Sequence, residues 1–317
     1  MLGRIVEIAS ERRYLSMERG FMLVSERGTV IGRIPLDDMS GLICNAHALS
    51  YSNNLLVALA ERGCPVVLCG KQHSPVAIIW PTDSHHVQGH RLDLQIRMTV
   101  PRRKQLWQQL VQSKLSMQAA ALDVCGRSGA PLRMMVRKVS SGDSSNIEGQ
   151  GARVYWSLLF GSDFRRDVDA DGINGLLNYG YAILRSCVAR HLMGCGLHPG
   201  IGLHHSNDAN SFRLVDDVME PVRPLVDILV WTLTEAGLVE VDSGTKKILG
   251  LLPTRSVLTK RGISPVTVVV QRLCESMVNA LGSGKAKLEL PHQHKDPLKN
   301  FLSVSSPSGS DSGATEA

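Results

Sequence analysis

Histidine and acidic side chains stand at three places where their types and spacing suit metal chemistry on a phosphate. The candidate ligands are two adjacent histidines and four acidic residues: His204, His205, Glu148, Asp216, Asp217 and Glu220. Hard divalent cations prefer carboxylate oxygens, and a neutral imidazole can complete their coordination. The pattern therefore predicts a divalent-cation site able to act on a phosphate.

Glu148 also has a structural interpretation. Ser145 and Glu148 have the spacing of a capping box, in which the glutamate closes the start of a helix. The two interpretations are compatible, because a helix N-terminus favours the ionised carboxylate that a cation needs. Gly149 and Gly151 are unusual early in a helix, where each costs about 1 kcal/mol relative to alanine. They suggest that another backbone or a DNA strand comes close.

The histidines also have alternatives. Adjacent side chains on an extended segment point to opposite sides, so only one of His204 and His205 is expected to face a given site. The other interpretation is one buried and one exposed histidine without chemistry. His86 and His90 lie four residues apart on an expected helix and have a spacing that can hold zinc. No cysteine or carboxylate stands beside them, which disfavours that site.

The acidic cluster precedes an expected helix, where acids are common for structural reasons. Asp217 and Glu220 are three residues apart and share one face if the turn is already helical. A cation between two such carboxylates relieves their repulsion, whereas without one the pKa of one carboxylate rises.

Charge is unevenly distributed along the 317 residues, whose net charge is +6 with a pI near 9.0. Residues 101–140 hold eight Lys/Arg and one acid, and residues 243–274 hold six Lys/Arg and none. Such segregation indicates contact with a polyanion, although two solvated basic helix surfaces would look the same. Aromatic residues make up only 4%, which favours contact with backbone phosphates over base stacking.

The first eighty residues predict a small β domain with one helix. Short β-rich runs are separated by glycine or charged turns: 4–9, 12–17, 21–25, 29–34, 65–69 and 76–80. A helical pattern over 52–62 interrupts them and ends at Gly63. We expect a sandwich-like domain over 1–80 and a linker over 81–84.

The remaining chain predicts an essentially all-α catalytic domain over 85–302, so that the whole is expected to be a two-domain α+β protein. Helical periodicity runs from 85 to about 126 with a break at Pro101, and continues in later segments: 146–160, 173–195, 221–237 and 264–281. The serine- and glycine-rich tail over 303–317 is expected to be disordered. Seven cysteines without a Cys-x-x-Cys pair, no signal peptide and no membrane span favour a cytoplasmic protein.

Several motifs together resemble the CRISPR-associated integrase that captures new spacers, in the form found in type II systems. They cover most of residues 146–227: 146–156, 174–184, 196–205, 210–217 and 219–224. When the family's ligand positions are carried over to the matching motifs, the resemblance implies that Glu148, His205 and Glu220 bind Mg²⁺ or Mn²⁺. His205 is chosen over His204 by its spacing to the final acid, and it could serve as a proton shuttle instead. Met117 and Val154 depart from the family pattern without touching these positions.

The resemblance also implies an activity and partners. A 3′-hydroxyl of incoming protospacer DNA would attack a phosphodiester at the edge of a CRISPR repeat. The β domain would serve dimerisation, and two homodimers would flank a small ferredoxin-like partner in a heterohexamer. In type II systems the RNA-guided effector nuclease and a ring-forming accessory protein can join.

DNA contacts are expected from basic residues near the acids and in the second basic segment: Arg153, Arg223, Lys246, Lys247 and Arg255. A non-catalytic DNA-binding scaffold and a metal-dependent phosphoesterase acting on small substrates remain alternative functions.

Overall fold

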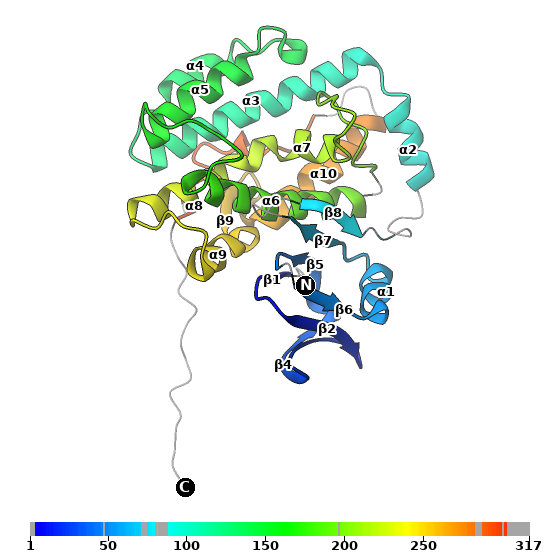
Figure 1. Cartoon of the computed structure of the whole chain (residues 1–317). Helices are drawn as coiled ribbons and strands as arrows, with labels where there is room; N and C mark the ends of the chain where they lie inside the picture. Colours follow the sequence, from blue (N-terminus) through cyan, green and yellow to red (C-terminus); the bar gives the residue numbers. More distant parts are fainter. Residues whose placement is uncertain are drawn as a thin grey trace.

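A β-rich N-terminal part and a mainly helical C-terminal part make up the protein, as the sequence predicts (Figure 1). The computed structural model describes residues 4–46, 48–70, 75–79, 81, 88–195, 197–282, 287–299 and 301–302. The expected linker at 82–84, His86 and the expected disordered tail at 303–317 lie outside the described residues. The domain boundaries therefore stay predictions.

Two four-stranded sheets form the N-terminal part. One sheet has the order β1 (Arg4–Ile8), β5 (Met39–Cys44), β7 (Val66–Cys69), β8 (Pro75–Ile79). The other has the order β4 (Thr29–Pro35), β3 (Phe21–Glu26), β2 (Arg13–Glu18), β6 (Leu49–Tyr51). Helix α1 (Asn53–Glu61) packs with both through a shared apolar core that includes Leu15, Leu42 and Leu55.

Strands β5 and β6 were not predicted. Strand β5 lies between β1 and β7, pairs with both in parallel and is almost wholly buried. A strand buried on both faces does not alternate polar and apolar residues, so the period-2 signal is absent. Strand β6 has three residues and depends on its parallel pairing with β2.

The C-terminal part is built around the long buried helix α6 (Ile173–Gly194), which contacts β5 of the first sheet. Around it the structure places helices α2 (Gln88–Ile96), α3 (Val100–Val124), α4 (Ala130–Val136), α5 (Ile147–Phe160), α7 (Arg213–Met219), α8 (Arg223–Glu235), α9 (Ser243–Gly250) and α10 (Val266–Gly282). Helices α3 and α5 lie on the side of α6 away from the sheets (Figure 1). No described helix combines the length and apolarity needed to cross a membrane.

The expectation of an all-α second domain is wrong in one place. Strands β9 (Ser256–Thr259) and β10 (Gly262–Pro265) form an antiparallel hairpin within it. Gly262 has a φ of 95°, which lets the chain turn there. Pro265 ends β10, so α10 begins later than the predicted start at 264. The short helices α4, α7 and α9 were not predicted either.

The predicted capping box at the start of α5 is also wrong. The N-cap is Asn146, in the left-handed conformation, and its side chain accepts from the backbone N–H of Gly149 at 3.1 Å. The Asp143 carboxylate accepts from the backbone N–H groups of Ile147 and Glu148, each at 2.9 Å. These two residues satisfy the helix start, so the Glu148 side chain is free for another task.

Close packing explains the small residues on α5. A Cβ atom at Gly151 would collide with the Leu115 side chain of α3, and one at Gly149 would crowd the Asn146 cap. The expected close approach at Gly151 therefore involves a side chain of a neighbouring helix. It lets α5 lie directly against α3.

A buried polar cluster locks α5 to α8 behind Glu148 and Glu220. The Tyr155 hydroxyl donates to Asp227 Oδ2 at 2.9 Å, and the Tyr181 hydroxyl donates to Oδ1 at 2.5 Å. Tyr155 and Asp227 each follow one of the glutamates by seven residues, about two helical turns. The cluster thus fixes how α5 and α8 sit against each other.

Burial raises the pKa of Asp227 from 3.8 to about 6, against the opposing effect of the two tyrosine hydrogen bonds. Between about pH 4 and pH 6 the folded protein therefore binds more protons at this group than the unfolded chain. Stability then falls as the pH rises through this range, by about 3 kcal/mol in total. We expect Asp227→Asn to remove this contribution.

Urea unfolding of both proteins at several pH values from 4 to 7 measures this effect. As the pH rises, the unfolding free energy of the parent should fall relative to that of Asp227→Asn. A difference that stays constant over the range would contradict the account.

Candidate active site

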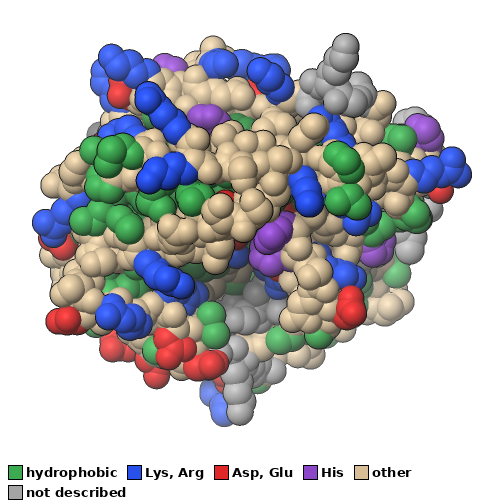
Figure 2. Space-filling model, turned by 90° about the horizontal axis from the view of Figure 1, so that it is seen from above, with side chains coloured by type: hydrophobic (Ala, Val, Ile, Leu, Met, Phe, Trp, Pro, Cys, Tyr) green, Lys and Arg blue, Asp and Glu red, His purple; other side chains and the backbone are tan. Residues whose placement is uncertain are grey.

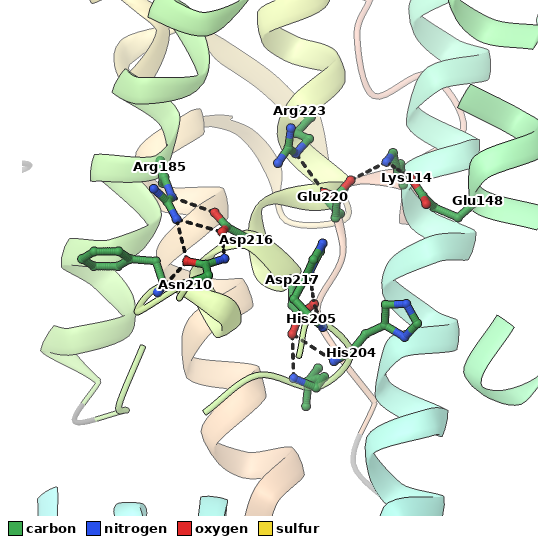
Figure 3. Close-up of polar contacts among 12 residues, drawn as sticks. Lys114, Glu148, Arg185, His204, His205, Asn210, Asp216, Asp217, Glu220 and Arg223 are labelled. Atoms are coloured by element: carbon green, nitrogen blue, oxygen red, sulfur yellow. Dashed lines mark hydrogen bonds and ion pairs between the residues drawn. The ribbon is translucent and has the colours of Figure 1, made fainter. Parts of the chain in front are cut away.

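Glu148 and Glu220 meet at one lysine ammonium group. Glu148 lies in the first turn of α5, and Glu220 begins the short 3-10 helix η4 (Glu220–Val222) that joins α7 to α8. Lys114 of α3 forms an ion pair with Glu148 and another with Glu220 Oε2, the latter at 2.5 Å (Figure 3). The structure thus brings together two carboxylates that are far apart in the sequence.

The side chains of these ion pairs are largely shielded from solvent. The Glu220 side chain is 6% exposed and that of Lys114 is 10% exposed, whereas that of Glu148 is 28% exposed. Arg223 Nε lies 2.9 Å from Glu220 Oε1. The cluster therefore balances two carboxylates with two cations.

The pKa values of this cluster favour the charged forms. Burial alone would raise the pKa of Glu220, but Arg223 and Lys114 outweigh it and lower this pKa. Burial alone would lower the pKa of Lys114, but its ion pairs with Glu220 and Glu148 outweigh that and raise it. Ionised Glu220 is the form that a cation requires.

His205 is oriented by Asp217. The His205 Nδ1 atom lies 2.6 Å from Asp217 Oδ1, and Asp217 is fully buried. Because an ionised carboxylate only accepts hydrogen bonds, Nδ1 carries the proton and Nε2 of the neutral ring is left to bind a metal or accept a proton. The hydrogen bond to Asp217 raises the pKa of His205 above its usual value, against an opposing effect of burial.

Asp217 also holds the histidine loop itself. Its carboxylate accepts backbone N–H groups from Leu203 at 2.6 Å, His204 at 3.1 Å and His205 at 3.3 Å. A Cβ atom at Gly202 would lie 2.8 Å from the His205 carbonyl oxygen and 3.0 Å from Asp217 Oδ2. The glycine is therefore needed for the loop to close over the buried aspartate.

The His204 side chain makes a different contact. Its ring stacks on Trp107 of α3, with ring centroids 4.3 Å apart and an interplanar angle of 2°. The two histidine rings are nearly perpendicular to each other, at 80°. The His205 ring also meets Trp107, edge to face with ring centroids 5.9 Å apart, and the two imidazole centroids lie 6.0 Å apart. The two side chains therefore do not point to opposite sides as expected, and the choice of His205 as the ligand stays a prediction.

The Asp216 carboxylate is bound by other side chains, on the opposite side of α7 (Figure 3). Arg185 of α6 contacts its two oxygens at 2.7 and 2.8 Å, and the Asn210 amide donates to it at 2.7 Å. These contacts anchor the loop between His205 and α7. Asp216 therefore has a structural role.

The metal-ligand assignment stays a prediction. Within the described part of the chain, no three His, Cys, Asp or Glu side chains are grouped as a metal site. Two ionised carboxylates nevertheless share one cation, and His205 is near enough that it lowers the pKa of Glu220, as a smaller effect than those of Arg223 and Lys114. Two oxygen donors and one imidazole fit Mg²⁺ or Mn²⁺. The zinc alternative for His86 and His90 is not tested, because His86 lies outside the described residues.

The predicted DNA contacts fall into two regions. Arg153 is exposed on α5, where it lines a cavity of about 650 Å³ with Trp156, Phe164 and Arg165. Arg223 is engaged with Glu220 and also lies over the Tyr181 ring, 4.8 Å from its centroid. Arg223 therefore belongs to the glutamate cluster, whereas Arg153 lines a cavity that includes neither glutamate.

The other predicted contacts lie farther away. Lys246 and Lys247 are on α9, which lies beyond α6 and α8 as seen from α3 and α5 (Figure 1), and both line a cavity of about 400 Å³ that includes Glu7. Arg255 donates to the Phe301 carbonyl at 3.3 Å. The DNA contacts expected of these three residues stay predictions.

Basic side chains surround the centre of the α3–α5 face. In Figure 2, which looks onto this face from above, histidine side chains border a central hollow, with Lys and Arg side chains around it. Most of the visible acidic side chains lie toward the edges. This arrangement suits a polyanion that enters the hollow.

The sequence matches the protein family described as CRISPR associated protein Cas1 over residues 6–248. The chain belongs to the Cas1 family. It is 34% identical over 292 residues to the CRISPR-associated endonuclease Cas1 of Neisseria meningitidis, covering 90% of this chain and 95% of that protein. A CRISPR-associated endonuclease Cas1 of Pyrobaculum aerophilum is 30% identical, covering 68% and 77%. The family resemblance inferred from the motifs is confirmed.

Solved structures share the Cas1 fold. A casposase bound to integration product matches with a TM-score of 0.74 and 17% identity, covering 93% of this chain and 94% of that one. A Cas1 protein from Thermotoga maritima matches with a TM-score of 0.72 and 16% identity, covering 88% and 97%. A chain of a Cas6-RT-Cas1–Cas2 complex also matches, with a TM-score of 0.74 and 16% identity, and this chain spans 36% of it.

Sequence reasoning missed Lys114 and Trp107, which complete the site from α3. A lysine inside a helical run reads as a solvated surface residue, although its neighbours Ser113 and Leu115 are both fully buried. Met117, the departure from the family pattern, is also fully buried, so it replaces the usual side chain within the core. Nothing in the local sequence shows that Lys114 faces two glutamates.

Replacing Asp217 with asparagine tests the orienting contact. Asp217→Asn removes the negative charge that favours the protonated ring, so we expect the pKa of His205 to fall. NMR titration of the imidazole signals in metal-free protein measures it. Asp216→Asn is the matched control: the Asp216 charge raises the pKa of His205 less than the Asp217 contact does, so this variant should lower that pKa by less. An unchanged His205 titration in Asp217→Asn would refute the contact.

Proposed function

We propose that this Cas1 protein is a metal-dependent DNA integrase of CRISPR spacer acquisition. In the proposed reaction, a 3′-hydroxyl of protospacer DNA attacks a phosphodiester at the edge of a CRISPR repeat. The observation that carries the proposal is the convergence of Glu148 and Glu220 on one cation beside the Asp217-oriented His205. A protein of the same fold has been solved bound to an integration product, which supports this reaction class.

The proposed ligands are Glu148, Glu220 and His205 through its Nε2 atom. When bound, Mg²⁺ or Mn²⁺ would neutralise charge on the phosphate and lower the pKa of the attacking hydroxyl. Asp217 keeps the imidazole in one tautomer and holds its loop. Arg223 compensates the charge of Glu220, so it acts on phosphate only indirectly unless it leaves that ion pair.

His205 as a proton shuttle is the alternative within this mechanism. The hydrogen bond to Asp217 raises its pKa, which favours the protonated ring that could deliver a proton to a leaving oxygen. In either role, the Asp217 contact sets which ring nitrogen faces the reacting groups.

The partners are inferred from family membership. We propose double-stranded protospacer and repeat DNA, a homodimer formed through the β domain, and a small ferredoxin-like subunit in a heterohexamer. A structural neighbour belongs to a complex named for Cas1 and Cas2. For a type II system we further propose contact with the RNA-guided effector nuclease and an accessory ring protein, in the cytoplasm.

Strand transfer tests the two glutamates. Glu148→Gln or Glu220→Gln keeps the side-chain size but removes an anionic donor, so we expect a loss of strand transfer of at least about a hundredfold. The assay joins a 3′-hydroxyl to a branched, half-integrated DNA in the presence of Mn²⁺. Asp208→Asn is the control, because Asp208 is fully exposed on the loop before α7 and pairs with Arg213, away from the two glutamates in the ion pairs of the described residues.

Thermal unfolding of each variant establishes that it folds. Undiminished strand transfer by either glutamine variant would refute the ligand assignment. Hydrolysis of a small phosphodiester without joining or cutting of DNA would favour the phosphoesterase alternative. DNA binding without any turnover would favour the scaffold.

A further inference from the structure

The Lys114 ammonium group stands between the two carboxylates that are the proposed metal ligands. It contacts both Glu148 and Glu220 and is itself buried in the protein. Figure 3 shows it between the two acids, reached from a third element, α3. A monovalent cation therefore holds the position that a divalent ion needs.

Packing forces the lysine into this position. Its neighbours on α3, Ser113 and Leu115, are fully buried, and the Ser113 hydroxyl lies 2.7 Å from His292 Nδ1 in the 3-10 helix η6 (Pro291–Gln293). The C-terminal segment thus covers α3 beside Lys114. Burying a lysine is costly unless an anion compensates its charge, and the two glutamates provide that compensation.

The two glutamates in turn depend on the positive charge of Lys114. Glu220 is almost wholly buried, and Arg223 contacts only its Oε1 side. Without a cation between them, two carboxylates this close would repel each other, and one would be driven to take up a proton. The described residues offer no other basic side chain in an ion pair with Glu148.

We propose that Lys114 is an internal counter-cation, which holds Glu148 and Glu220 together in the metal-free protein and gives way when a divalent ion binds. This inference rests on the proposed function, because it requires a metal at these carboxylates. The released ammonium stays tethered to α3 beside the ion, where its charge adds to the attraction for a phosphate. Lys114 is a positioning residue in this account.

Mn²⁺ binding in the absence of DNA tests the exchange. Lys114→Met removes the competing cation, so we expect Mn²⁺ to bind at least about tenfold more tightly. The metal-free variant should unfold at a lower temperature than the parent, and Mn²⁺ should raise its unfolding temperature more than it raises that of the parent. Electron paramagnetic resonance of unbound Mn²⁺ and thermal unfolding give these two readouts.

Two control variants separate exchange from a general charge effect. Arg153→Gln removes a positive charge from an exposed position of α5, five residues after Glu148, without touching the carboxylates, so Mn²⁺ affinity should change by less than about threefold. Lys114→Arg keeps a competing cation and should bind Mn²⁺ no more tightly than the parent. Equal tightening by Lys114→Met and Arg153→Gln would overturn the exchange.

Amine labelling of the unaltered protein provides a second test that needs no variant to fold. An amine-reactive reagent followed by mass spectrometry should modify Lys114 slowly without metal and faster with Mn²⁺, while Lys246 reacts at one rate throughout. An unchanged or slower Lys114 rate on addition of Mn²⁺ would overturn the proposal.

The outcomes distinguish this inference from the proposed function. Failure of both the parent and Lys114→Met to bind Mn²⁺ would overturn the metal-dependent function, and the exchange with it. Tight Mn²⁺ binding by the parent, with weaker binding by Lys114→Met, would overturn the exchange alone. In that case Lys114 would support the bound metal.

Discussion

The site depends on one electrostatic constraint: two carboxylates in a poorly hydrated place must share a cation. Glu220 is buried and Glu148 is partly exposed, and only a cation between them makes this arrangement stable. Lys114 meets that requirement here, so three helical elements converge on a single ammonium group. The same constraint makes the place attractive to a divalent ion, whose charge compensates both carboxylates at once.

The surrounding structure fixes the positions of these groups. Behind the glutamates, Asp227 accepts hydrogen bonds from two buried tyrosines and ties α5 to α8. Beside them, the buried carboxylate of Asp217 fixes both the backbone of the histidine loop and the His205 ring. Each of these aspartates supports a proposed ligand without being one. The Cas1 fold thus places its chemistry on helices whose mutual positions are fixed by buried polar contacts.

Local patterns in the sequence predicted much of the fold but not the contacts within the site. The predicted bounds of helices α5 and α6 agree with the structure to within a residue. The central strand β5 was missed because a strand buried on both faces lacks alternation. The hairpin of β9 and β10 was missed because its short strands depend on pairing with each other.

The candidate ligands could be selected from residue types and spacing, whereas their supporting residues could not. Lys114 looks like a surface lysine until the fold places it against two acids that come from other helices. Asp217 was noted near the site, but its role depends on three backbone N–H groups that the loop directs at it. The cap at Asn146 replaced the expected one at Ser145 because Asp143 already satisfies the first backbone groups of α5. Such assignments require the fold, since each depends on geometry between segments.

The most direct test of the central claim is a crystal structure of the protein grown with Mn²⁺ and measured at the manganese absorption edge. The account predicts an anomalous peak in contact with Glu148, Glu220 and Nε2 of His205, with the Lys114 ammonium moved out from between the carboxylates. A manganese ion bound elsewhere, with Lys114 still bridging the two glutamates, would contradict it.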